Sequence, residues 1–96
     1  MELYTYIMEL RGGTYVAQVE ANNISDSVFK WIEQIEREVG EIKYIGNRTI
    51  SELKQMFLIN LIDEPIKLNR VSNVWYLGIY CKVGKMLINI VNTKQI

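Results

Sequence analysis

Two pairs of segments alternate apolar and polar residues with the period of two that β-strands require. Residues 3–10 and 14–21 flank Gly12-Gly13, and both glycines can adopt the positive φ of a type I′ turn. One face of this hairpin is then entirely apolar or aromatic, and a slip of one residue would swap the faces, so the pattern favours the hairpin. The pairs expected on that face are Tyr4/Ala21, Tyr6/Val19, Met8/Ala17 and Leu10/Tyr15.

A second hairpin is predicted from residues 74–83 and 86–92, with Val83-Gly84 at its tip. Val-Gly is an unfavourable two-residue turn, so the residues of this turn fix the register less firmly than those of the first. The pairs expected on the apolar face are Trp75/Asn92, Leu77/Ile90, Ile79/Ile88 and Cys81/Met86. Those expected on the other face are Tyr76/Val91, Gly78/Asn89 and Tyr80/Leu87.

Between the hairpins the apolar period changes to that of a helix. The first predicted helix covers about 24–39, with Asn23 as its N-cap and Gly40 just past its end. Its stripe should lie on the apolar face of the first hairpin. The stripe consists of Ile24, Val28, Trp31, Ile32, Ile35 and Val39.

A second predicted helix covers about 50–60, because Thr49 and Glu52 have the spacing of a capping box and Pro65 ends the helical region. Residues 58–62 are apolar nearly all round, so we expect them to be deeply buried or at an interface. Short strands are expected at 41–45 and 66–68.

These elements predict one α+β domain over residues 1–96, an antiparallel sheet of two hairpins with two helices packed on one face. Hydrophobic residues make up 49% of the chain and charged residues 23%, which is ordinary for a globular protein. A single cysteine and the absence of a signal-peptide pattern or long apolar stretch lead us to expect a cytoplasmic protein without membrane contact.

The net charge of zero conceals an asymmetry. Residues 1–42 hold eight acids and three bases, and residues 43–96 hold eight bases and three acids. Either the two halves attract each other within one fold, or the charges form opposed surface patches, one of which meets a partner.

The sequence argues against catalysis and cofactor chemistry. Without histidine the chain lacks the usual neutral-pH base and the triads built on it, and one cysteine cannot form a CxxC metal site. Gly12-Gly13 belongs to no phosphate-loop motif and is predicted to be a plain turn. We therefore expect a non-enzyme without catalytic, cofactor or metal residues.

Protein binding is the leading functional hypothesis, because six tyrosines and two tryptophans are more amphipathic aromatic surface than one small core hides. The partner would be another protein or a second copy of the chain. A nucleic-acid-binding module using the basic C-terminal half is one alternative, and a small-molecule binder or weak enzyme is another. The candidate interaction surface consists of Tyr76, Tyr80, Lys82, Lys85, Lys67 and Arg70.

The opening segments Tyr4–Met8, Gly13–Val19 and Ser25–Val28 resemble the strand–strand–helix start of HicB-like antitoxins over about 35 residues. The proline- and glycine-rich segment of those proteins is missing here, and no DNA-binding helix-turn-helix or ribbon-helix-helix follows. The resemblance is one of topology, and it implies an antitoxin-like inhibitor without assigning roles to residues. Small bacterial immunity proteins are similar in size and composition, which is an analogy at the level of the fold.

Overall fold

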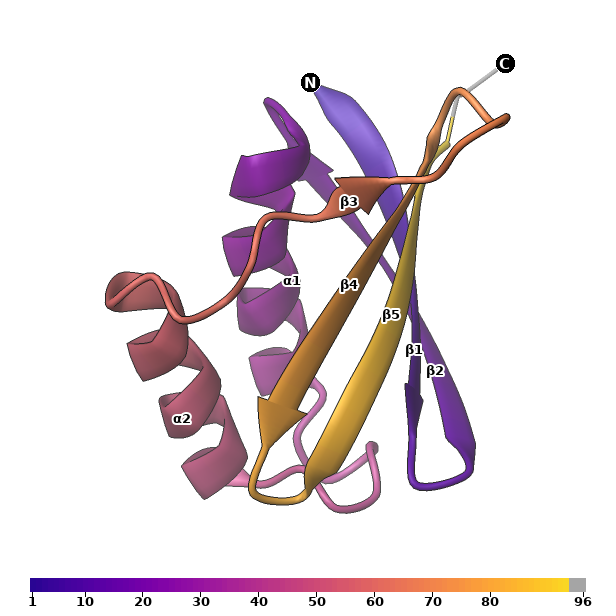
Figure 1. The fold of residues 1–96 in the computed structure, drawn as a ribbon. Helices are drawn as coiled ribbons and strands as arrows, with labels where there is room; N and C mark the ends of the chain where they lie inside the picture. Colours follow the sequence, from indigo (N-terminus) through magenta and orange to yellow (C-terminus); the bar gives the residue numbers. More distant parts are fainter. Residues whose placement is uncertain (94–96) are drawn as a thin grey trace.

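The computed structural model describes residues 1–93, in which a sheet and two helices form two layers (Figure 1). The chain opens with a hairpin of β1 (Glu2–Leu10) and β2 (Gly13–Ala21), followed by α1 (Ile24–Arg37) and α2 (Asn47–Leu58). A two-residue strand, β3 (Ile66–Lys67), leads into a second hairpin of β4 (Val74–Cys81) and β5 (Gly84–Asn92). The predicted α+β class, with its two hairpins and helices on one face, is confirmed.

The five strands are antiparallel and lie in the order β2-β1-β5-β4-β3. The first and last long strands are therefore neighbours at the centre of the sheet, where Tyr6 lies opposite Ile90 and Met8 opposite Ile88. The two hairpins are joined by this pairing, and their apolar faces form one continuous surface that both helices cover.

Helix α1 packs on the first hairpin as its apolar stripe predicts. Trp31 is fully buried, and its ring stacks on that of Tyr6 at a centroid distance of 5.2 Å and an interplanar angle of 14°. The side chain of Asn23 accepts a hydrogen bond from the backbone N–H of Asp26 at 2.8 Å, which confirms the predicted N-cap. The helix ends at Arg37, two residues before the predicted end.

Helix α2 begins three residues before the predicted position and ends at Leu58 rather than near residue 60. Its N-cap is Gly46, and Thr49 lies inside the first turn, where it is buried. The predicted capping box is therefore wrong, because Thr49 is needed on the packed side of the helix rather than at its end. The predicted strand at 41–45 is also absent; this segment forms turns with a single bridge between Val39 and Ile42.

The first hairpin has the predicted faces but a register shifted by two residues. Leu10 lies opposite Gly13 rather than Tyr15, and the turn consists of Arg11 and Gly12. Both have positive φ, 49° and 85°, as a type I′ turn requires. Because the shift is even, every side chain stays on its predicted face.

The second hairpin shows the same displacement. Cys81 lies opposite Gly84, so Lys82-Val83 forms the turn that was predicted at Val83-Gly84. The predicted faces hold here as well. At the other end of the hairpin, β3 pairs with Trp75 and Tyr76, so the predicted edge strand at 66–68 is present in shorter form.

One ion pair in the described part of the chain connects the acidic and the basic halves. The Lys54 ammonium on α2 lies 2.8 Å from the Glu36 carboxylate on α1. Neither of the two described helices combines the length and hydrophobicity needed to cross a membrane.

Candidate functional site

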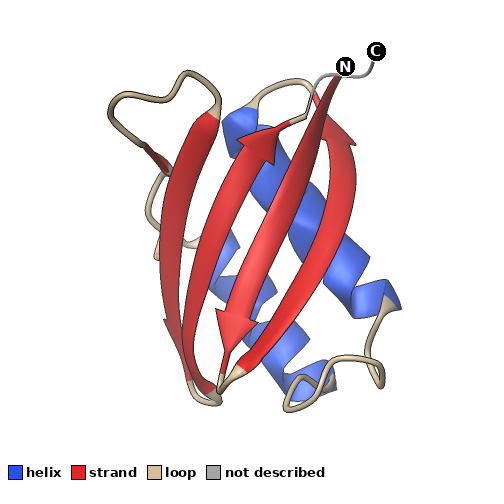
Figure 2. Cartoon of the chain, turned by 90° about the vertical axis from the view of Figure 1, so that its right-hand side faces the viewer, coloured by secondary structure: helices blue, strands red, loops and turns tan. Residues whose placement is uncertain are grey.

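The side of the sheet that faces away from the helices is uncovered, and we call it the open face (Figure 2). It is formed by the residues that alternate with the buried core positions of the strands. Only Glu9, Glu20 and Lys85 on it are charged. Its residues are Leu3, Thr5, Ile7, Glu9, Thr14, Val16, Gln18, Glu20, Ile66, Val74, Tyr76, Gly78, Tyr80, Lys85, Leu87, Asn89 and Val91.

One row of the open face crosses all five strands. The strand registers place these side chains next to one another in the order Val16, Ile7, Asn89, Tyr76 and Ile66. Val16 and Ile66, at the two ends, have 61% and 64% of their surface exposed. Four apolar or aromatic side chains and one amide therefore form a single row across the sheet.

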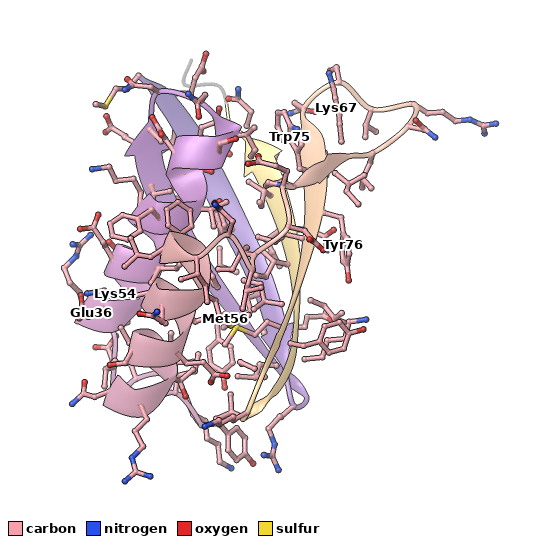
Figure 3. All side chains as sticks on the ribbon, turned by 60° about the vertical axis from the view of Figure 1, so that its left-hand side comes forward. Glu36, Lys54, Met56, Lys67, Trp75 and Tyr76 are labelled. Atoms are coloured by element: carbon pink, nitrogen blue, oxygen red, sulfur yellow. The ribbon has the colours of Figure 1, made fainter. Side chains whose placement is uncertain are left out.

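Tyr76 lies flat along its strand because the residue two positions on is glycine. A Cβ added to Gly78 would be 3.0 Å from the Tyr76 hydroxyl oxygen, so the ring covers this glycine. Figure 3 shows Tyr76 on the side of β4 away from the helices, whereas the adjacent Trp75 turns toward the other side. The covered glycine therefore fixes a broad aromatic surface near the centre of β4.

Tyr80 and Lys85 face each other across β4 and β5 and extend the open face toward the second hairpin turn. The Lys85 ammonium lies 4.8 Å from the centre of the Tyr80 ring, within the range of a cation–π contact. A hydrogen bond with the Tyr80 side chain raises the pKa of Lys85, so the pair favours the charged amine. Tyr80 is 70% exposed and available to a ligand.

A shallow groove of about 200 Å³ beside β4 has Asp63 and Glu64 in its lining together with Tyr76, Tyr80 and Lys85. Ser25 at the start of α1 donates a hydrogen bond of 2.6 Å to the Glu64 carboxylate, which fixes the loop before β3. The groove therefore brings two acids to the part of the open face that carries its one base.

The structure brings together three of the six predicted surface residues, Tyr76, Tyr80 and Lys85. The other three lie elsewhere. Lys82 is in the second hairpin turn, where its backbone N–H points to the Glu52 carboxylate at 3.3 Å. Lys67 of β3 pairs with Trp75 at the opposite end of the hairpin (Figure 3), and Arg70 lies in the loop between β3 and β4 (Figure 1).

The sequence did not predict that Ile7 and Val16 of the first hairpin, and Ile66 of β3, would join the row that crosses the open face. The alternating pattern did assign them to the less apolar faces of their strands. Which of those faces would become neighbours depends on the pairing of β1 with β5, and a pairing between distant segments leaves no local signal.

A second exposed apolar group follows the end of α2. Leu58, Ile59 and Leu61 are all exposed, and Asn60 between them has a φ of 59°. The prediction of deep burial for this segment is wrong, which leaves the expectation of an interface.

A metal-ligand cluster and a reactive thiol are two further kinds of site that bear on the chemistry of the described residues. No three His, Cys, Asp or Glu side chains among residues 1–93 gather in a group that could hold a metal. Burial raises the pKa of the Cys81 thiol, which opposes formation of the reactive thiolate. The thiol donates a hydrogen bond to the Gly84 carbonyl at 3.3 Å.

Comparison with known proteins found no relative of this chain. The chain matches no protein-family model, and neither the curated proteins nor the solved structures contain a significant match to it.

Proposed function

We propose that this chain is a non-catalytic protein-interaction module, in the manner of an antitoxin or immunity protein, whose open face receives a protein partner. The observation that carries the proposal is the uncharged row that crosses all five strands, in which Tyr76 lies flat over Gly78 next to Asn89. Protein interfaces are depleted of charge at their core and enriched in aromatic residues. The open face has both properties.

The distribution of charge favours a protein over a nucleic acid. A nucleic-acid surface combines stacking aromatics with several cations that neutralise phosphates. Here Tyr76 and Tyr80 share their surface with one cation, Lys85, and the nearby groove contributes Asp63 and Glu64. The cations Lys67, Arg70 and Lys82 are at the two ends of the second hairpin.

The substitution Leu87→Lys distinguishes protein binding from nucleic-acid binding. Leu87 is exposed on β5 and lies opposite Glu9, so a lysine there can be solvated and faces a carboxylate. On a protein-binding face the new charge must be desolvated, and we expect at least a tenfold loss of affinity. On a phosphate-binding face the same charge would strengthen binding at low salt. Gln55→Lys, on the exposed side of α2, is the matched control.

The experiment is affinity capture from the native host with the wild-type chain, Leu87→Lys and Gln55→Lys, followed by titration of the captured protein. The proposal expects one protein to be held by the wild type and the control and lost by Leu87→Lys. Equal capture by all three chains, or no reproducible protein, would contradict it. Circular dichroism of each variant checks that the fold is retained.

Nucleic-acid binding is the second candidate, favoured by the Tyr80–Lys85 pair beside Tyr76. It is tested by titrating single-stranded oligonucleotides at low salt, where phosphate contacts are strongest. Binding that strengthens in Leu87→Lys would support this function in place of the first.

A further inference from the structure

Strand β2 forms one border of the sheet, and within residues 1–93 no strand pairs with its outer side. Leu10 and Gly13 close a two-residue turn, so they and every second pair beyond them exchange backbone hydrogen bonds. The intervening residues of β2 direct their N–H and C=O groups outward. These residues are Thr14, Val16, Gln18 and Glu20, and all four are exposed.

This border has few of the devices by which proteins protect an open strand, and Glu20 is its one charged residue. Natural edge strands are short, bulged, or interrupted by lysine or proline. Strand β2 is nine residues long, pairs with β1 without a bulge, and contains neither lysine, arginine nor proline. The opposite border of the sheet ends in β3, which has two residues.

We propose that β2 pairs antiparallel with β2 of a second copy across a two-fold axis, joining two sheets into one. In the favoured register Thr14 lies opposite Glu20 of the other copy and Val16 opposite Gln18. Ala17 lies on the axis and faces its own counterpart. This register uses the outward groups of all four residues on both copies, which gives about eight backbone hydrogen bonds.

The charges agree with this register. Glu20 meets Thr14, and no two like charges face each other directly. On the helix side, a groove of about 550 Å³ between β2 and α1 includes Lys30, Glu33 and Arg37. The Lys30 ammonium lies 4.0 Å from Glu33, and Arg37 donates to Gln34 at 2.6 Å. The flank that would approach the second copy therefore mixes both signs of charge.

The first test is the mass in solution, measured by light scattering after size-exclusion chromatography over 1–200 µM protein. We expect twice the 11.2 kDa of one chain at the upper concentrations. Val16→Pro removes an outward N–H that the single chain does not use, so it should retain the fold and return the mass to that of one chain. Val16→Thr, which keeps the N–H, should behave as the wild type.

The second test fixes the register by disulfide formation in a Cys81→Ser background. Ala17→Cys places two thiols opposite each other at the axis, and oxidised glutathione should link them while being reduced to two glutathione thiols. Thr14→Cys on the same strand is the control, because its counterparts would be about 20 Å apart along the strands, beyond the reach of a disulfide.

A single-chain mass at every concentration would overturn the proposal, as would a dimer that Val16→Pro leaves intact. Cross-linking by Thr14→Cys but not by Ala17→Cys would exclude the register. If Val16→Pro but not Val16→Thr instead releases a protein captured from the host by a monomeric wild type, the edge receives a partner strand and not a second copy. Leu87→Lys should remain dimeric, because Leu87 is not on β2. Failure of the proposed function can therefore be told apart from failure of the β2 pairing.

Discussion

A buried chain of hydroxyl groups connects the sheet to helix α1, and a double-mutant cycle measures its contribution to stability. The Ser27 hydroxyl lies 2.6 Å from the Ile24 carbonyl, and the Tyr6 hydroxyl lies 2.7 Å from the Ser27 oxygen. A carbonyl can only accept, so Ser27 donates its one proton to Ile24 and Tyr6 donates to Ser27. Both side chains are completely buried.

The direction of these two hydrogen bonds makes the two single substitutions unequal in their cost to stability. Ser27→Ala leaves the Tyr6 hydroxyl as a buried donor without its acceptor, which costs about 1–3 kcal/mol in the free energy of unfolding. Tyr6→Phe removes the donor while Ser27 keeps its bond to the Ile24 carbonyl, and it costs about 0.5–1.5 kcal/mol. Ser27→Ala should therefore be the more destabilising change.

The double variant discriminates between coupled and independent groups. Once Ser27 is alanine, replacing Tyr6 by phenylalanine removes the unsatisfied hydroxyl. We therefore expect the double variant to be less destabilised than the sum of the single variants by about 1 kcal/mol or more. It should also be no less stable than Ser27→Ala alone.

Urea unfolding monitored by circular dichroism gives the four free energies of the cycle. Fluorescence of Trp31, which stacks on Tyr6, provides a second probe of the same transition. Additive single effects, within about 0.5 kcal/mol, would refute the reasoning because they would mean that the two hydroxyls are not coupled by a hydrogen bond.

Three further predictions concern the core, the pH dependence and the first turn. Trp31→Ala should cost about 3–5 kcal/mol, since the fully buried indole fills the space between α1 and Tyr6, and a wild-type midpoint in urea would contradict this packing. Burial raises the pKa of the Tyr6 hydroxyl above the ordinary 10.0, so above pH 10 the unfolded chain releases a proton that the folded chain keeps. Stability should therefore be complete below pH 10 and fall above it by up to about 1.4 kcal/mol per pH unit, and an unchanged alkaline slope in Tyr6→Phe would argue against this assignment. Gly12→Ala should cost about 1 kcal/mol because Gly12 has a φ of 85°, whereas Gly46→Ala, at a φ of −123° with open space around it, should change the melting temperature little.

The faces of both hairpins could be predicted because alternation is a local property that survives a shift of two residues. The turn positions could not, since Gly12-Gly13 permits two placements and the sequence does not reveal that Arg11 adopts a φ of 49°. In the structure the Arg11 guanidinium lies 4.3 Å from the Tyr44 ring centre and 3.3 Å from the Val83 carbonyl. The positive φ of Arg11, which residues other than glycine disfavour, therefore occurs together with side-chain contacts to Tyr44 and Val83, which are distant in the sequence.

The candidate site was predictable only in part, for a similar reason. Tyr76, Tyr80 and Lys85 belong to one hairpin, so their shared face follows from alternation. Ile7 and Val16 join them through the pairing of β1 with β5, which the sequence pattern does not encode locally. Likewise Thr49 has the spacing of a helix cap, but its burial against the core outweighs that local signal.

The adjacency of β1 and β5 has a consequence for the order of folding during synthesis. Strand β1 ends at Leu10, and β5, which pairs with its inner edge, begins only at Gly84. At ordinary elongation rates the interval is about 4–15 seconds. Throughout that time the nascent hairpin has an unpaired inner edge and an incompletely covered apolar face, and such edges recruit other chains. The topology therefore adds a period during synthesis in which this chain is exposed to aggregation.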